Sequence, residues 1–133
     1  MKFGIMTGAI PDPAASIDGF TTLAREVEAR GFASLWLANT QGHDAVTAMA
    51  MAGCETKAIE VGTAVTPIHP RHPTALAQQA LTASAVARGR FTLGIGLSHK
   101  LVTEDTLGLS YAQPAKTMRE YLEILMPLLA HRT

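Results

Sequence analysis

The feature that most constrains the fold of this chain is a regular alternation of short apolar runs with helix-like segments. The apolar runs occupy residues 3–6, 34–38, 59–66 and 91–97. They have the length of strands, and glycine, proline or asparagine follows most of them closely. The runs are mainly apolar and lack a regular alternation with polar residues, which is typical of parallel strands covered on both faces.

Four further segments are predicted helices, at residues 16–30, 43–54 and 73–88 and from Lys116 onward. The second of them is rich in alanine and methionine, which favour helix. In the first, apolar side chains recur at the spacing of one helix face. The residues on that face are Ile17, Phe20, Leu23, Ala24 and Val27. In the last, Pro127 is expected to kink or fray the helix.

The boundaries of these helices carry their own signals. Ser16 opens the first helical pattern and Gly31 ends it. Pro73 suits the first turn of the third helix, where its missing N–H group would have no partner in any case. His72 precedes this proline at a position from which it could cap the helix, and Gly89 is the expected stop.

Four strand–helix units in 133 residues predict a parallel sheet with right-handed crossovers. We expect residues 1–133 to form a single domain. Two architectures fit this pattern: a small open α/β sheet, or half of a (β/α)8 barrel, whose full length is typically about 250 residues. The pattern alone does not choose between them.

Composition narrows the class of partner. Eleven basic residues balance eleven acidic ones, so no net field favours nucleic acid or an anionic membrane. No apolar run approaches the roughly 20 residues of a membrane-spanning helix, and the N-terminus lacks the pattern of a secretory signal. The single cysteine, Cys54, excludes an internal disulfide. We therefore expect a soluble cytoplasmic protein.

Five stretches of the chain match one known family in order and spacing: residues 31–38, 60–67, 71–80, 89–99 and 118–122. Together they resemble the luciferase-like flavin and deazaflavin oxidoreductases. Within the family the chain is most similar to the coenzyme F420-dependent subgroup. The resemblance implies an α/β fold that is the N-terminal half of a (β/α)8 TIM barrel. Because members are about twice this length, we expect a chain that stops before the barrel closes.

The resemblance also implies a function. A complete member would transfer a hydride between reduced coenzyme F420 and a small organic substrate. The alternative cofactor is FMN, in a luciferase-like monooxygenase. A third interpretation is a truncated, non-catalytic half barrel that only binds cofactor or pairs with another chain. In that case a homodimer or a second chain would complete the barrel.

In such a barrel the site lies at the carboxyl ends of the strands. His99 is the predicted catalytic residue, because a histidine moves protons near neutral pH. The predicted cofactor-binding residues are Gly8, Asn39, Ala64, Val65, Thr66, Gly96 and Ser98. The alternative is that these are ordinary polar turn residues at strand ends, and that His99 is a loop histidine bonded to backbone.

Two details of this set are specific. The resemblance implies a non-proline cis peptide at Ala64–Val65, which forms a bulge behind the deazaflavin ring; the alternative is an ordinary buried strand. Gly94 and Gly96 lack the third glycine of a dinucleotide-binding loop, so we expect them to let a ring or another backbone approach closely.

No metal site is expected. His69 and His72 lie three residues apart, but no carboxylate or cysteine accompanies them. Arg71, between them, could meet a phosphate of a cofactor or remain a solvated loop arginine.

Overall fold

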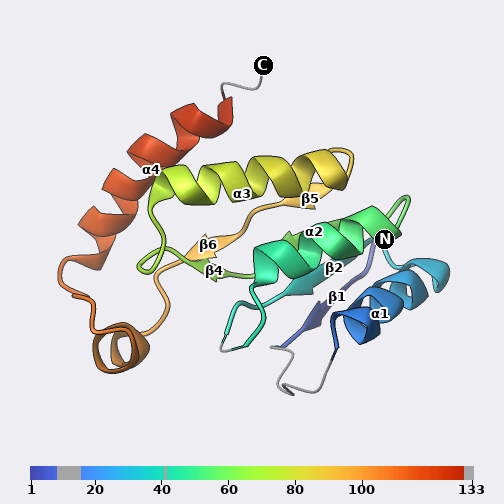
Figure 1. Cartoon of the computed structure of the whole chain (residues 1–133), viewed down its shortest axis with the longest axis horizontal. Coiled ribbons are helices and arrows are strands. Elements are labelled where there is room, and N and C mark those ends of the chain that lie inside the picture. The colour runs from blue at the N-terminus through green and yellow to red at the C-terminus, as the bar shows by residue number, and fades with distance from the viewer. Residues whose placement is uncertain (9–15, 41, 131–133) are drawn as a thin grey trace.

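The computed structural model describes residues 1–8, 16–40 and 42–130. Figure 1 shows strands that alternate with helices along the whole chain. The elements are β1 (Gly4–Thr7), α1 (Ile17–Ala29), β2 (Ser34–Leu37), α2 (Ala45–Glu55), β3 (Glu60–Thr63), β4 (Thr66–Pro67), α3 (Pro73–Val86), β5 (Phe91–Thr92), β6 (Ile95–Gly96), a short π-helix η1 (Val102–Thr106) and α4 (Pro114–Ala130).

The strands form a parallel sheet in the order β1-β2-β3-β5, and β4 pairs in parallel with β6 to form a second, two-stranded sheet. The predicted strand–helix alternation is thus confirmed. The predicted strands at 59–66 and 91–97 differ from the structure in one respect, because each is split in two. The first breaks at Ala64–Val65 and the second at Leu93–Gly94. As a result the second sheet lies at the carboxyl ends of β3 and β5.

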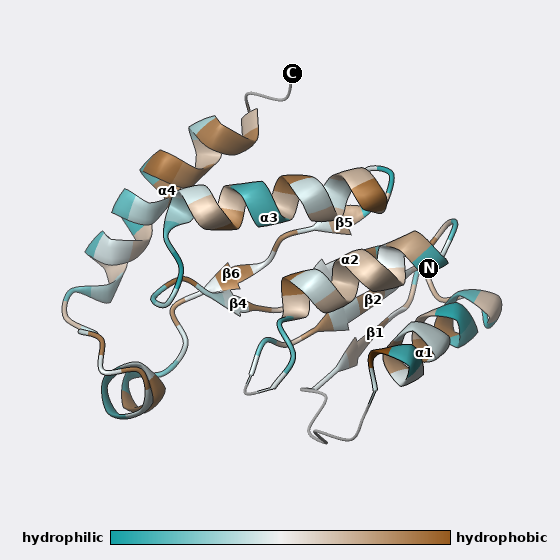
Figure 2. Ribbon diagram, viewed as in Figure 1, coloured by the Kyte–Doolittle hydropathy of each residue, from teal (hydrophilic) through white to brown (hydrophobic). Residues whose placement is uncertain are grey.

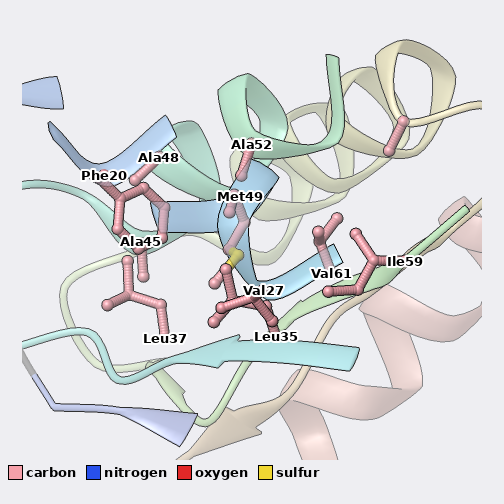
Figure 3. Close-up of a cluster of buried hydrophobic side chains, with 12 residues drawn as sticks. Phe20, Val27, Leu35, Leu37, Ala45, Ala48, Met49, Ala52, Ile59 and Val61 are labelled. Carbon is pink, nitrogen blue, oxygen red and sulfur yellow. The ribbon is translucent and has the colours of Figure 1, made fainter. Parts of the chain in front are cut away.

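The helices lie side by side along one face of the strands, in chain order from α1 to α4 (Figure 1). One row of side chains in register across the sheet, Ile5, Leu35, Val61 and Phe91, packs in the core beneath them. Figure 3 shows Leu35 pointing from β2 toward the helical side chains of this core. Burial of such side chains is the main force that holds the helices on the sheet.

The opposite face of the sheet carries the alternate row, because successive side chains of a strand point to opposite faces. Met6, Trp36 and Gly62 stand in register on this face. Met6 is 62% exposed, whereas its neighbour Ile5 packs against the core. Helices that cover a single face are the arrangement expected for half of a (β/α)8 barrel, whose second face would be the barrel interior.

The predicted helix boundaries are confirmed at several caps. The Ser16 hydroxyl accepts a hydrogen bond from the Gly19 N–H at 3.1 Å. His72 caps α3 through Nδ1, which accepts from the Thr74 N–H at 3.2 Å. Gly31 and Gly89 follow α1 and α3 with φ angles of +81° and +80°, the left-handed conformation that ends many helices.

The C-terminal helix differs from the prediction at its start. α4 begins at Pro114, two residues before Lys116, and continues through Pro127 to Ala130. The connection between β6 and α4 contains the π-helix η1. Figure 2 shows hydrophobic residues concentrated in the second half of α4. Among the helices of the described ranges, none has the length and apolar character needed to span a membrane.

Candidate functional site

A cavity of about 350 Å³ opens at the carboxyl ends of the strands. Four residues of the predicted site line it: Asn39 after β2, Val65 between β3 and β4, and Ser98 and His99 after β6. The structure thus brings together, around one opening, side chains from three separate strand–helix units. The position agrees with the general location of ligand sites in parallel α/β folds.

The other predicted site residues do not line this cavity. Gly8 follows β1 and is exposed. Thr66 is fully buried, because it lies in β4 with its side chain inside the protein. Ala64 and Gly96 are both partly buried. Ala64 precedes Val65 in the chain, and Gly96 lies against the Val65 side chain. Ala64 and Gly96 thus adjoin the cavity wall at Val65 without lining the cavity.

The Ala64–Val65 peptide is cis, as the resemblance implied. It lies between β3 and β4 and is held on both sides by main-chain hydrogen bonds. The Ala64 N–H donates to the Leu37 carbonyl at 2.9 Å, and the Val65 carbonyl accepts from the Asn39 N–H at 3.2 Å. The Val65 side chain is 41% exposed and forms part of the cavity wall.

Two glycines of the segment 91–97 allow a close approach to this bulge: a backbone lies against Gly94, as predicted, and a side chain against Gly96. A Cβ atom on Gly94 would collide with the Thr63 carbonyl oxygen. A Cβ atom on Gly96 would lie 2.5 Å from Cγ2 of Val65. Gly94 therefore leaves room for the Thr63 backbone, and Gly96 leaves room for the Val65 side chain.

The segment after β6 closes one side of the cavity. Ser98 has a φ angle of +61°, and its carbonyl oxygen accepts a hydrogen bond from the Tyr111 hydroxyl at 3.3 Å. The Tyr111 ring stacks on His69, with ring centroids 5.4 Å apart. The His99 carbonyl accepts from the Thr103 N–H at 2.9 Å, while the exposed His99 side chain lies at the cavity.

Sequence reasoning missed several wall residues. Pro67 ends β4 and Pro70 lies in the β4–α3 loop, while Val102, Thr106 and Leu107 come from η1 and its end. They give the cavity a largely apolar wall. No motif marks them, because their place at the cavity depends on the course of the connections after β4 and β6 and not on a periodic pattern.

Arg71 also lines the cavity, and its guanidinium is engaged by protein groups. Nη2 donates to Oδ1 of Asp44 at 2.5 Å and to Oδ1 of Asn39 at 3.3 Å. Asp44 is the N-cap of α2, and its Oδ2 accepts from the Thr47 N–H at 2.8 Å. Burial disfavours the charged form of Asp44, but the hydrogen bonds from Thr47 and Arg71 outweigh it and lower the pKa of this carboxyl.

Nothing in the described ranges resembles a metal centre. Among residues 1–8, 16–40 and 42–130, no group of three or more histidine, cysteine, aspartate or glutamate side chains is placed to hold an ion. Nδ1 of His72 is occupied as a helix cap.

The fold has counterparts among known proteins. The sequence profile of the luciferase-like monooxygenase family matches residues 1–133, so the chain belongs to that family. Its four strand–helix units are those of the family's barrel, and the chain forms half of it.

Individual relatives agree with this assignment. A Mycobacterium tuberculosis protein, named as a coenzyme F420-dependent oxidoreductase, is 34% identical over 133 residues, which are 100% of this chain and 38% of the relative. The coenzyme F420-dependent tetrahydromethanopterin reductase of Methanopyrus kandleri superposes with a TM-score of 0.76 at 24% identity, over 93% of this chain and 39% of its own.

A flavin enzyme has the same fold. The oxygenating constituent of 3,6-diketocamphane monooxygenase from Pseudomonas putida, in complex with FMN, superposes with a TM-score of 0.80 at 20% identity. The match covers 94% of this chain and 38% of that enzyme. In each of these three comparisons the chain spans about two fifths of the relative's length, from 38% to 39%.

Proposed function

We propose that the cavity binds the ring system of reduced coenzyme F420 and belongs to an oxidoreductase that transfers a hydride to a small organic substrate. The observation that carries the proposal is the convergence of Asn39, Val65, Ser98 and His99 on one cavity. Its volume of about 350 Å³ falls within the range of roughly 300–1,000 Å³ typical of small-molecule sites.

The residues present fit such a ring. Gly96 leaves room for Val65, whose exposed side chain would support one face of a flat aromatic system. Pro67 and Leu107 supply further apolar surface, while Asn39 and Ser98 supply polar groups at the edge. When bound, coenzyme F420 supplies hydride chemistry, and the protein supplies orientation and exclusion of water.

His99 is the residue that we propose for proton transfer. Its side chain is exposed at the cavity, so it has access both to a bound substrate and to solvent. Reduction of a carbonyl or imine by hydride requires a proton at the heteroatom, and an imidazole is suited to deliver it near neutral pH. Ser98 precedes it in a left-handed conformation and orients this turn.

FMN is the second candidate cofactor. The relative bound to FMN has the same fold over 94% of this chain, and the cavity walls would suit an isoalloxazine ring as well. We favour coenzyme F420 because the M. tuberculosis relative named for it is 34% identical over the whole of this chain.

The proposed activity belongs to an assembly. Within the described residues β1 and β5 each have a single strand neighbour, so two parallel edges are open, and the face that carries Met6 and Trp36 is uncovered. Open edges invite pairing with further strands. We propose that further strand–helix units, from a second copy of this chain or from a second chain, complete the barrel around the cavity.

Fluorescence titration of the purified chain with reduced and oxidised coenzyme F420, with FMN as competitor, tests this function. Saturable binding of coenzyme F420 that FMN does not displace is the expected result. Preferential binding of FMN would move the protein to the flavin monooxygenases. Binding of neither cofactor, in the chain alone and in its assembled form, would leave a non-catalytic half barrel.

A further inference from the structure

The guanidinium of Arg71 joins three segments that meet at the cavity. It donates through Nη2 to Asp44, the N-cap of α2, and to Asn39, which follows β2. Through Nη1 it donates to the carbonyl of Pro67, in β4, at 3.4 Å. The side chains of Arg71 and Asp44 are only 19% and 29% exposed, so this ion pair is less screened by water than a surface pair.

Asn39 is the member of this network that touches the bulge. Its Oδ1 accepts both from Arg71 and from the N–H of Ala45, the first residue of α2, at 3.0 Å. Its own N–H donates to the Val65 carbonyl at 3.2 Å. The side chain and the main chain of Asn39 therefore hold the start of α2 and the cavity wall at the same time.

Arginine suits this role because its planar fork presents several N–H groups in fixed directions. Lysine would keep the charge opposite Asp44 but would lose the simultaneous bonds to Asn39 and Pro67. The two oxygens of Asp44 are divided in the same way, with Oδ2 on Thr47 and Oδ1 on Arg71. The network thus fixes directions as well as charge.

We propose that Arg71 is a positioning residue for the cavity: it acts through Asn39 to hold the Val65 carbonyl, and with it the Val65 side chain, in a place suited to a bound ring. The part of this inference that concerns a bound ring rests on the proposed function. The link between Arg71 and Asn39 is a property of the protein alone and is measured without a cofactor.

The test compares Arg71→Ala and Arg71→Lys with the wild type. Amide hydrogen exchange is read at Asn39 and, as a reference at the other end of the sheet, at Ala58, whose N–H is bonded to Glu28. We expect exchange at Asn39 to rise about tenfold or more in both variants and exchange at Ala58 to stay unchanged, because only the local bonds are lost. A low concentration of guanidinium ion is expected to reverse the effect in Arg71→Ala only.

Cofactor affinity is measured in the same variants by titration with coenzyme F420 and with FMN. We expect both Arg71 variants to bind the preferred cofactor about tenfold more weakly than the wild type. Arg25→Ala is the matched control. It removes an ion pair of 2.9 Å between Arg25 in α1 and Glu55 in α2, whose side chains are 52% and 48% exposed. We expect this variant to leave both the exchange rate at Asn39 and the cofactor affinity unchanged.

The outcomes separate the two claims. Unchanged exchange at Asn39 would overturn the link to Arg71, whatever the cofactor does. Faster exchange with unchanged affinity would overturn the role in positioning the cavity while the proposed function stands. Failure of the wild type itself to bind either cofactor would overturn the proposed function, and with it the role of Arg71 in a cofactor site.

Discussion

Thr63 and Gly94 are joined by two hydrogen bonds at the point where β3 and β5 end. The Thr63 hydroxyl donates to the Gly94 carbonyl at 2.9 Å and accepts from the Gly94 N–H at 3.0 Å. One hydroxyl can do both, because it carries one donor and two acceptor sites. The pair replaces the ladder between the two strands beyond their last paired residues, Gly62 and Thr92.

Replacing Thr63 by valine should destabilise the protein by about 1–3 kcal/mol, because the Gly94 N–H loses its partner in a buried place. Thr63→Ser keeps the hydroxyl and should cost less than half as much. Urea unfolding followed by circular dichroism measures both. Equal losses in the two variants would contradict this explanation, because serine retains the hydroxyl that valine lacks.

Gly96→Ala should weaken cofactor binding with little loss of stability. The new Cβ would lie 2.5 Å from Cγ2 of Val65, so the valine side chain must shift within the cavity wall. We expect about tenfold weaker binding in the fluorescence titration. The double variant Gly96→Ala with Val65→Ala removes the colliding methyl groups and should bind better than Gly96→Ala alone. An additive double variant would contradict this explanation.

Stability should depend on pH through Glu28. This carboxylate accepts from the N–H groups of Lys57, Ala58 and Ile59. Burial disfavours its charge, but these bonds outweigh burial and hold the pKa of Glu28 below its ordinary value of 4.5. A pKa lower in the folded state means a stabilisation that is complete above about 4.5 and lost as pH falls through the lowered pKa.

Urea unfolding of the wild type and Glu28→Gln between pH 7 and pH 3 checks the sign. At pH 7 the variant should be less stable by about 1 kcal/mol, and the difference should vanish on acidification. Glu26→Gln, at an exposed position of the same helix, is the matched control. A difference that persists unchanged at pH 3 would assign the effect of Glu28 to packing.

The sequence predicted the strand–helix order, the helix caps and four residues of the cavity. It did not predict the strand breaks, because an apolar, β-branched run such as residues 59–66 looks the same with or without an interruption. The cis peptide at Ala64–Val65 was expected from the resemblance and not from any pattern. Leu107 was missed because its place depends on a loop that Tyr111 anchors to His69.

Arg90 should be a strong determinant of stability. Its Nη1 donates to the Ile59 carbonyl at 2.5 Å, and its Nη2 donates to the carbonyls of Gly53 and Thr56, both at 2.8 Å, where α2 ends. Arg90→Ala should cost about 2–3 kcal/mol, since these acceptors lose a charged donor. Arg90→Lys should recover only part of the loss. A thermal or urea midpoint equal to that of the wild type would contradict this assignment.

Met6→Glu should disrupt assembly without unfolding the chain. Met6 is 62% exposed on the uncovered face of the sheet, so a charge there meets water in the free chain. We expect a stability change within about 0.5 kcal/mol. Sedimentation velocity should show loss of any assembly that covers this face. Met51→Glu, at a position 41% exposed on α2, is the control and should assemble normally.

The division of the strands into a main sheet and the separate β4–β6 pair has a consequence for how such a protein can diversify. The buried row through Leu35 and Val61 belongs to the main sheet, whereas Val65 and Ser98 adjoin the small one. If the proposed site is correct, its ligand preference can change around the small pair while the hydrophobic core beneath the helices keeps its sequence. For an engineer, residues 98–113 are the segment to exchange, while the main sheet β1-β2-β3-β5 is retained as a constant scaffold.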